Sequence, residues 1–448
     1  MTRVLVISND VVGSQMAGPA IRYVQLARHL SRRFDVTLVV PTTPDVSPPG
    51  IEIVVEPDPD RAGRLGRRYD VAVTQVLSIS AMNALARSDT RTIFDLYVPF
   101  MIENLGFFAD QADPTRREFD YRLTNHLQDT ALRTGDAFIC ASERQRDLWL
   151  GYLGARGRIG LPGYIHDPDF SELVRVVPFG LDPSPPQHTK QVLKGVVPGI
   201  REDDRVLLWG GGIWNWFDPL TLIRAVGQLA RTRDDVKLYF LGVTHPNPSV
   251  PAMSMAVRAV ELSKELGLLD RHVFFNLGWV PYDERHNYLL EADIGVSTHF
   301  DTIETRYAFR TRMLDYFWAG RPIVATGGDT LADLVATREL GLTVRAGDPQ
   351  ELADAITRLL DDDDRYRQAQ TNVMAIRNEY SWPVVVSGLA ELIDATAGQS
   401  PTAPSRFAKP RHLSLVARNV YRQSRVRRVI TAADKRRRDQ STGRTAAR

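Results

Sequence analysis

Two series of short apolar segments, separated by stretches of helical length, constrain the fold of this 448-residue chain more than any other feature. The first series is RVLVIS, DVTLVV, YDVAV, TIFDL, AFICA and LVRVVP, and the second is RVLLWG, VKLYFLG, VFFNLG, DIGVST, RPIVAT and LGLTVRA. Short apolar strands that alternate with helices are typical of a parallel sheet buried on both faces. We therefore predict an α/β fold with two doubly wound halves that face each other across a cleft, and ligands beyond the carboxyl ends of the strands.

A polar segment that contains Pro and Gly, QHTKQVLKGVVPGIRED, separates the two series. We predict an amino-terminal domain over 1–195 and a carboxy-terminal domain over 204–380, both Rossmann-like. A final helix is expected over 381–398, where the sequence is WPVVVSGLAELIDATA. The Pro- and Ser-rich QSPTAPSRFAKP then begins a linker and tail over 399–448.

Charge is distributed unevenly along the chain. Residues 401–448 hold 14 basic and two acidic residues, which leaves 42 basic and 52 acidic residues in the preceding 400. No apolar run approaches the roughly 18 residues that cross a bilayer, and the start MTRVLVISND predicts a first strand rather than a signal peptide. We expect a cytoplasmic protein. The single cysteine, Cys140, excludes an internal disulfide and argues against a cysteine-built zinc site.

The stretch LLWGGGIWNWFDPLTLIRA, at 207–225, places three glycines and two tryptophans before a predicted helix that Asp218 can cap and Pro219 can begin. A loop between the carboxyl end of a strand and the amino end of a helix offers free N–H groups and a positive dipole end, which suit a phosphate. Glycine allows close approach, and Trp214 or Trp216 can lie along a base or sugar face. The alternative is a tight turn whose tryptophans pack between the domains. This stretch alone does not separate the two.

A second stretch, HFDTIETRYAFRTRMLDYFWAGRPIVATGG at 299–328, favours the ligand-binding interpretation. We predict a helix over about 310–318 with five charged residues in it or just before it: Glu304, Arg306, Arg310, Arg312 and Asp315. Three arginines at a helix amino end, facing the glycine loop from the same edge of the sheet, suit a diphosphate. The carboxylate one turn further on can accept two ribose hydroxyls. A surface network of arginines and carboxylates is the alternative.

Within this stretch, LDYFWAGRPIVAT resembles the retaining family 4 glycosyltransferases, whose pattern is an acidic residue, an aromatic residue or Ala, and then A-x-G-x-P and a hydrophobic residue. Supporting pieces are the early loop GSQMAGPAIRYVQLARHL, the segment VVPFGLD, and YSWPVVVSGLAELI, which is similar to the family's helix that crosses back to the first domain. The resemblance covers roughly residues 1–396. It implies the GT-B fold, with an acceptor-side first domain, a nucleotide-sugar-binding second domain and a carboxy-terminal crossover helix.

The resemblance also implies roles for individual residues. Asp315 stands where the family's second glutamate holds the donor ribose, and Gly18 matches the glycine of the first loop that approaches the donor phosphates. Gly211 and Gly212 match the diphosphate-side loop of the second domain. Asp95, in TIFDLYVP, lies near where many members place a residue against the donor sugar, so it is expected to orient sugar hydroxyls.

The chain also departs from the family pattern. Members have two glutamates with seven residues between them, but the position eight before Asp315 is Tyr307, and Glu304 is the nearest acid. The family's Arg and Lys around the glycine loop are missing, with Ile213 and Phe217 in their places. We hypothesise that Arg310 and Arg312 supply the displaced positive charge, that Trp214 encloses the donor, and that Glu304 orients sugar hydroxyls.

The expected reaction moves a sugar from a nucleotide-diphosphate donor to a hydroxyl acceptor, with retention of configuration. Arginines, helix ends and glycine N–H groups would neutralise the leaving diphosphate, so no metal or other cofactor is expected. A nucleotide-dependent dehydrogenase is disfavoured because the first loop lacks G-x-G-x-x-G and the second strand ends without an acid. A sugar-nucleotide epimerase of the same fold is the alternative enzyme.

The basic tail suggests a partner of another class. PRHLSLVARNVYRQSRVRRVITAADKRRRDQ can form a basic helix with apolar residues, which anionic lipid attracts. Nucleic acid is not expected, because only Tyr421 is available to stack on a base. We expect residues 401–448 to bind an anionic membrane surface, with a solvated tail as the alternative. A peripheral enzyme on the inner face of the membrane would suit a glycan or lipid-linked acceptor in surface polysaccharide or glycolipid synthesis.

Overall fold

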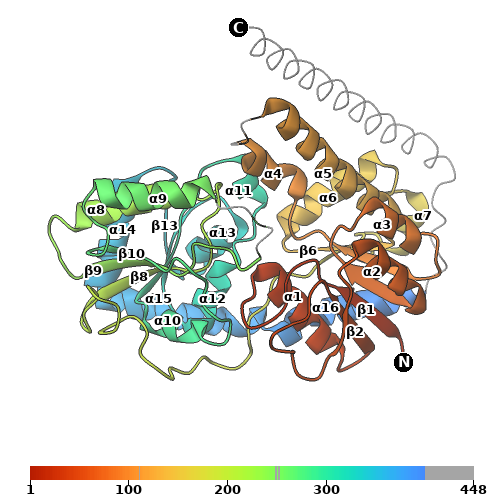
Figure 1. The fold of residues 1–448 in the computed structure, drawn as a ribbon, viewed down its shortest axis with the longest axis horizontal. Coiled ribbons are helices and arrows are strands. Elements are labelled where there is room, and N and C mark those ends of the chain that lie inside the picture. The colour runs from red at the N-terminus through yellow and green to blue at the C-terminus, as the bar shows by residue number, and fades with distance from the viewer. Residues whose placement is uncertain (110, 112, 248–249, 251–252, 399–448) are drawn as a thin grey trace, which may run out of the picture. The chain divides into compact units, whose positions relative to one another are not determined.

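A computed structural model describes residues 1–398 except 110, 112, 248–249 and 251–252. Its strands form two parallel sheets (Figure 1). The first sheet has the order β3-β2-β1-β4-β5-β6-β7 and the second has the order β10-β9-β8-β11-β12-β13. Both orders begin from a central strand and wind outward in two directions, so the predicted doubly wound halves are confirmed. The predicted tail lies outside the described residues.

The strands of the first sheet are β1 (Arg3–Ile7), β2 (Asp35–Val40), β3 (Glu52–Val55), β4 (Val71–Thr74), β5 (Arg91–Asp95), β6 (Ala137–Cys140) and β7 (Val174–Val176). Those of the second are β8 (Arg205–Trp209), β9 (Val236–Phe240), β10 (Val273–Phe275), β11 (Ile294–Ser297), β12 (Ile323–Thr326) and β13 (Gly341–Val344). All thirteen pair in parallel. The sequence predicts every one of these strands except β3.

The helices of the amino-terminal half are α1 (Gly18–Leu30), α2 (Pro59–Leu65), α3 (Ile79–Leu85), α4 (Phe100–Ala109), α5 (Pro114–Thr134), α6 (Glu143–Ala155) and α7 (Leu161–His166), with the 3₁₀ turn η1 (Gly66–Arg68). Those of the carboxy-terminal half are α8 (Pro219–Leu229), α9 (Ser254–Glu265), α10 (Arg285–Glu291), α11 (Ile303–Tyr307), α12 (Arg312–Ala319), α13 (Thr330–Thr337), α14 (Pro349–Asp361) and α15 (Asp363–Ile376), followed by η2 (Arg377–Tyr380) and α16 (Trp382–Ala397).

Alternating residues of the central strands enter different layers of the core. In β8, Leu207 and Trp209 pack toward α8, α9 and α14, while Val206 and Leu208 pack toward α10, α12 and α15. Figure 1 shows these two sets of helices on the two sides of the second sheet. This alternation buries both faces of the sheet, as the apolar strand sequences predict. The loops at the carboxyl ends of the strands are therefore the parts left to bind a ligand.

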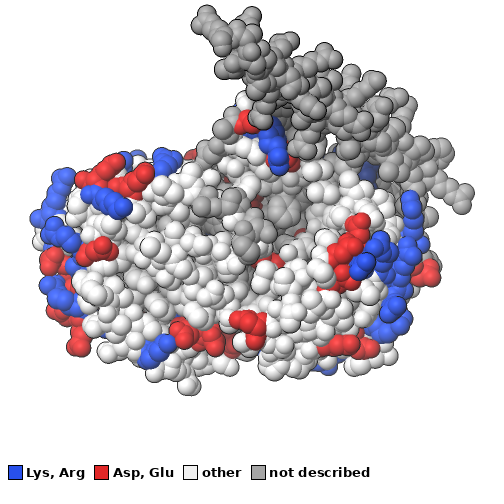
Figure 2. All heavy atoms as spheres, viewed as in Figure 1, with Lys and Arg blue, Asp and Glu red and all other residues white. Residues whose placement is uncertain are grey.

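Helix α16 packs against α1, β6 and β7 of the first half, although it follows the second half in the chain. The return is fixed where the backbone N–H of Trp382 donates to the carbonyl of Leu181 over 2.9 Å, and the Trp382 ring packs on Phe179. A Cβ on Gly180 would lie 2.5 Å from that ring, so only glycine fits there. The expected crossover helix is confirmed. On the face shown in Figure 2, Lys and Arg of the described residues lie among Asp and Glu.

Candidate functional site

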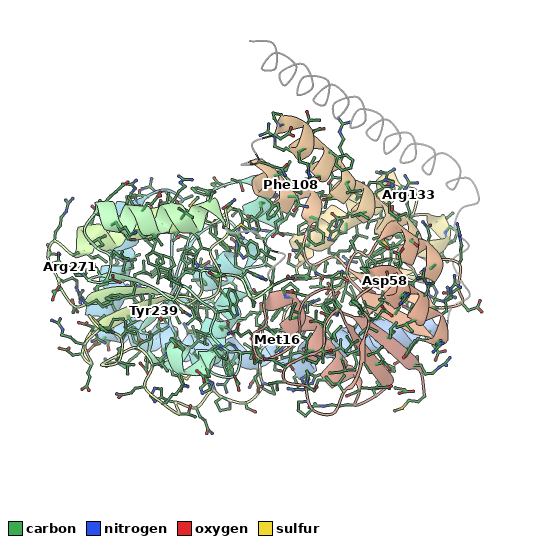
Figure 3. The ribbon with its side chains drawn as sticks, in the orientation of Figure 1. Met16, Asp58, Phe108, Arg133, Tyr239 and Arg271 are labelled. Atoms are coloured by element: carbon green, nitrogen blue, oxygen red, sulfur yellow. The ribbon has the colours of Figure 1, made fainter. Side chains whose placement is uncertain are left out.

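A cavity of about 530 Å³ lies where the carboxyl ends of both sheets meet, and we call it the central cavity. Loops that follow strands of both halves line it, including those after β1, β5, β8, β9, β10 and β11. Met16, which Figure 3 labels between the two halves, is part of its wall, and its carbonyl accepts a hydrogen bond from Trp279 Nε1 over 3.2 Å. The cavity therefore has the position that the doubly wound halves predict for a ligand.

The triple-glycine loop after β8 forms part of the cavity wall. Gly210 N donates to the Tyr316 hydroxyl over 2.8 Å, which fixes the start of the loop to α12. Gly211 has a φ of +77°, a conformation that favours glycine, and a Cβ there would meet nothing within 4 Å. The backbone at Gly211 is thus open for close approach by a ligand. Asp218 caps α8 directly after this loop by accepting from Thr221 N, as the sequence predicts.

Arg312 joins this loop to the start of α12. Its Nη2 donates to the Gly212 carbonyl over 2.9 Å, and its guanidinium lies over the rings of Trp209 and Phe217, at 4.3 and 4.1 Å from their centroids. The residue is 9% exposed, and its Nη1 has no hydrogen-bond partner within the described part of the chain. Burial, together with the charge of Arg310, lowers the pKa of Arg312 to about 9. The group therefore remains a cation at neutral pH, and no carboxylate of the described residues pairs with it.

Arg310 lies beside Arg312, over the same Phe217 ring at 4.8 Å. Its Nη1 and Nη2 donate to the two oxygens of Glu304 over 2.9 and 2.6 Å, which is a bidentate pair. Its Nε is buried without a partner among the described residues. Both arginines thus gather around the aromatic ring that stands where the family has a basic side chain. Helix α12 begins at Arg312, so Arg310 precedes it rather than lying inside the predicted helix.

Asp315 also lines the cavity, from the first turn of α12. Its Oδ1 accepts from Arg285 Nε over 3.3 Å. Arg285 is held by the rings of Tyr282 and Trp318, at 3.8 and 4.6 Å from its guanidinium carbon. No local sequence pattern marks Arg285, because its hydrogen bond to Asp315 joins two helices and residues that lie 30 positions apart.

Gly18 and Trp214 lie at the cavity as well. Gly18 begins α1, with Pro19 in its first turn, and a Cβ on Gly18 would meet nothing within 4 Å. Trp214 stacks on Trp216, with ring centroids 5.2 Å apart and planes 9° apart, and Trp216 lies against Gly106 of α4. The sequence left two alternatives for these tryptophans, contact with a ligand or packing between the domains. The structure is compatible with both, because Trp214 and Trp216 line the cavity and also pack between the halves.

Two expected site residues lie away from the cavity wall. Arg306 is exposed at the end of α11 and is not among the residues that line the cavity, so it does not join the other two arginines. Asp95 is 2% exposed and pairs with Arg22, whose Nε lies 2.6 Å from Asp95 Oδ2. Arg22 also donates to the carbonyls of Val177 and Pro178. The expectation that Asp95 orients sugar hydroxyls is therefore corrected to a supporting position beneath Tyr97, which does line the cavity.

Glu103 of α4 lines the cavity and was missed from the sequence. It is half-buried, and burial together with the charge of Glu304 raises its pKa to about 8. The sequence does contain a signal for Glu103, because it is the single charged residue in the apolar segment FMIENLGFFA. Helix α4, which carries Glu103, packs against α11 of the other half.

No group of three His, Cys, Asp or Glu side chains among the described residues is placed to hold a metal ion. No described helix is long and apolar enough to cross a membrane. His299, next to the arginine-rich stretch, is fully buried, and its Nε2 lies 3.0 Å from Asp329, which caps α13.

Comparisons with known proteins show what the chain is similar to. Residues 204–362 match the family model described as glycosyl transferases group 1. D-inositol 3-phosphate glycosyltransferases are similar to the chain: that of Corynebacterium urealyticum is 28% identical over 214 residues, and that of Nocardia farcinica is 26% identical over 197 residues. These alignments cover 48% and 44% of this chain, and only 47% and 42% of the relatives' own lengths.

Solved structures share this fold over most of the chain. Sucrose-phosphate synthase from Thermosynechococcus elongatus has a TM-score of 0.60 at 16% identity, and covers 88% of this chain and 99% of its own. HepE from Anabaena, solved in complex with UDP-glucose, has a TM-score of 0.60 at 15% identity and covers 88% and 100%. These similarities confirm the GT-B fold.

Proposed function

We propose that this protein transfers a sugar from a nucleotide-diphosphate donor to a hydroxyl acceptor, because residues 204–362 match the family model described as glycosyl transferases group 1 and the chain has the GT-B fold. The donor binds in the central cavity, with its diphosphate between the triple-glycine loop and the start of α12. The configuration of the transferred sugar is retained, as in the family 4 enzymes that the motifs resemble.

The observation that carries this proposal is that the guanidinium of Arg312 is buried and pairs with no carboxylate of the described residues. A buried guanidinium without a carboxylate is costly, because its desolvation is not repaid by an opposite charge. The unpartnered Nη1, the aromatic rings that hold the group, and the open backbone at Gly211 all suit an incoming anion. A diphosphate has the charge and the acceptor oxygens to pair with this arginine.

The remaining groups have roles that follow from their positions. Each oxygen of Glu304 accepts one hydrogen bond from Arg310 and has a further lone pair for a sugar hydroxyl. In this proposal Asp315, which accepts a hydrogen bond from Arg285 Nε, accepts the ribose hydroxyls. Gly18 brings the amino end of α1 to the other side of the donor phosphates. Retaining transfer then requires that the acceptor hydroxyl is held on the face from which the diphosphate leaves, with water excluded.

A thermal-shift panel tests the donor assignment and identifies the base. Ligands that bind only the folded state raise the melting temperature, so UDP, TDP and GDP are compared at equal concentrations, with the monophosphates as controls. We expect one diphosphate to give a larger shift than its monophosphate. Equal shifts for a diphosphate and its monophosphate would contradict a site built for pyrophosphate.

The proposed transfer uses no metal. The positive charge of Arg312, the glycine N–H groups and the helix ends replace it. We expect the rate of sugar transfer to be unchanged in EDTA. Loss of activity in EDTA with full recovery in Mg²⁺ or Mn²⁺ would contradict this.

A sugar-nucleotide epimerase of the same fold is the alternative enzyme. An epimerase needs only the donor, whereas a transferase also needs an acceptor. Incubation with the donor alone, followed by separation of the nucleotide sugars, distinguishes them. Conversion to a second nucleotide sugar without acceptor would favour the epimerase.

We further propose a glycan or lipid-linked acceptor at an anionic membrane surface, with residues 401–448 as the contact. The 14 basic residues of this tail support the proposal. Anionic lipid attracts basic residues by about 1 kcal/mol each near the surface. The tail itself lies outside the described residues, so the proposal rests on its composition.

A further inference from the structure

Helix α11 carries Glu304, yet it is too short to be held in place by its own hydrogen bonds. It spans only five residues, and no side chain forms a hydrogen bond that caps its amino end. Helices shorter than about 12 residues are marginal in water unless tertiary packing supports them. The placement of Glu304 and of its partner Arg310 therefore depends on what anchors residues 302–311, which we call the α11 segment.

Two helices of the amino-terminal half pack against α11. They are α4 and α6, whereas α11 belongs to the carboxy-terminal half by its place in the chain. The first turn of α6 makes a second contact with the carboxy-terminal half, because Arg144 Nη1 donates to the Gly328 carbonyl over 2.8 Å and Arg144 Nη2 pairs with Asp333. The amino end of α6 thus bridges the two halves.

Gln145, which follows Arg144 in α6, makes the specific contact with α11. Its Nε2 donates to the carbonyl oxygens of Tyr97 and Tyr307, each over 2.8 Å, and its Oε1 accepts from the backbone N–H of Ala141 over 2.8 Å. The side chain is fully buried, and both N–H groups and the oxygen of its amide are used. The opposite orientation of the amide would place its oxygen against two carbonyl oxygens, so these contacts fix which atom donates.

The two carbonyl groups that Gln145 joins belong to different halves. Tyr97 follows β5 of the amino-terminal half and lines the central cavity, and Tyr307 is the last residue of α11. Tyr307 also stands at the position where the chain departs from the family pattern of two glutamates. The next four residues, 308–311, all line the cavity. A shift of the Tyr307 backbone would therefore move part of the cavity wall.

We propose that Gln145 is a positioning residue that holds the α11 segment against the amino-terminal half. It acts through the Tyr307 carbonyl, and so keeps Glu304 and Arg310 where the proposed function needs them. The inference rests on that function, which gives Glu304 a hydrogen bond from a sugar hydroxyl. Both N–H groups of the Gln145 amide are bound to protein carbonyls, so this residue has no donor left for a substrate.

Arg312 is held independently of Gln145. Its Nη2 donates to the Gly212 carbonyl, and its guanidinium lies over the rings of Trp209 and Phe217. All three partners belong to the carboxy-terminal half. Loss of the Gln145 amide should therefore weaken contacts with the donor sugar and spare contacts with the diphosphate.

Hydrogen exchange of the full-length Gln145→Met variant tests whether this side chain holds the α11 segment. Methionine has a similar length but no N–H group, so two buried carbonyls lose their donor. We expect backbone amides of the α11 segment to exchange at least about tenfold faster than in the wild type. Gln145→Asn, whose amide is too short to span both carbonyls, gives the same comparison if Gln145→Met does not fold.

The matched control is Gln25→Met. Gln25 is also buried, and its Nε2 reaches the Tyr282 hydroxyl of the other half over 3.5 Å, but it does not line the cavity. Exchange of the α11 segment in this variant should equal that of the wild type. Unchanged exchange in the Gln145 variant, or equal acceleration in both variants, would overturn the inference.

Calorimetry distinguishes positioning of the donor site from a role in stability alone. Dissociation constants are measured for UDP with UDP-glucose, TDP with TDP-glucose, and GDP with GDP-mannose. For the base that binds, we expect Gln145→Met to bind the nucleotide diphosphate within about threefold of the wild type, and the nucleotide sugar about tenfold more weakly. A role in stability alone would leave both affinities of the folded variant unchanged.

The outcomes separate this inference from the function on which it rests. If Gln145→Met binds the nucleotide sugar as tightly as the wild type does, the positioning role is overturned and the proposed function stands. If none of the diphosphates and nucleotide sugars binds to the wild type, the proposed function fails. The exchange measurement needs no ligand, so it still decides whether Gln145 holds the α11 segment.

Discussion

At the scale of the residue, Arg312 combines a cost in stability with a use in binding. Burial lowers its pKa to about 9, so the folded state disfavours the charged form. At neutral pH both folded and unfolded states are protonated, and this cost is present in full. We therefore expect Arg312→Met, which replaces the charge with a flexible apolar chain, to raise the melting temperature of the unliganded protein by a few degrees. Differential scanning calorimetry measures this change in melting temperature. A marked fall in the melting temperature would contradict the prediction, because it would show that contacts within the protein already offset the cost of burying the guanidinium.

At the scale of the element, the Arg22–Asp95 pair fixes α1 to the end of β5, and so positions Gly18 at the cavity. Both side chains are fully buried, and their nitrogen and oxygen atoms lie 2.6 Å apart. Removal of one partner leaves an unpaired buried charge, which costs about 3–5 kcal/mol. We expect Asp95→Ala to lose stability of this order in urea denaturation, while the folded fraction still binds the nucleotide diphosphate. Lost binding with unchanged stability would instead return Asp95 to direct contact with the donor.

At the scale of the whole molecule, the charge asymmetry of the chain leads to a prediction for the tail. The 14 basic and two acidic residues of 401–448 follow a body in which acids outnumber bases by 52 to 42. We expect the full chain to sediment with anionic vesicles at low salt, and residues 1–398 to sediment less. The difference should shrink as salt rises, because the Debye length is only about 8 Å at 0.15 M. Equal sedimentation of the two chains would contradict a membrane contact through the tail.

The sequence predicts elements better than it predicts the contacts between them. Twelve strands follow from their apolar runs, but β3 was missed because it is a half-buried edge strand after a segment rich in Pro and Gly. The meeting of the glycine loop with Arg312 follows from their places at the same edge of one sheet. In contrast, Glu103 and Arg285 enter the site through packing between helices distant in the chain, which no local pattern records. Arg306 shares the pattern of its neighbours, but its side chain is exposed outside the cavity.

The central claim is that a leaving diphosphate is received at Arg312, and its most direct test is the affinity for the nucleotide diphosphate selected by the thermal-shift panel. Calorimetry compares wild type, Arg312→Met and the matched control Arg306→Met. A hydrogen bond to a charged group contributes about 1.5–3 kcal/mol, so we expect Arg312→Met to weaken binding by about tenfold to a hundredfold. Arg306→Met should bind as the wild type does. Unchanged affinity in Arg312→Met, or an equal loss in both variants, would contradict the account.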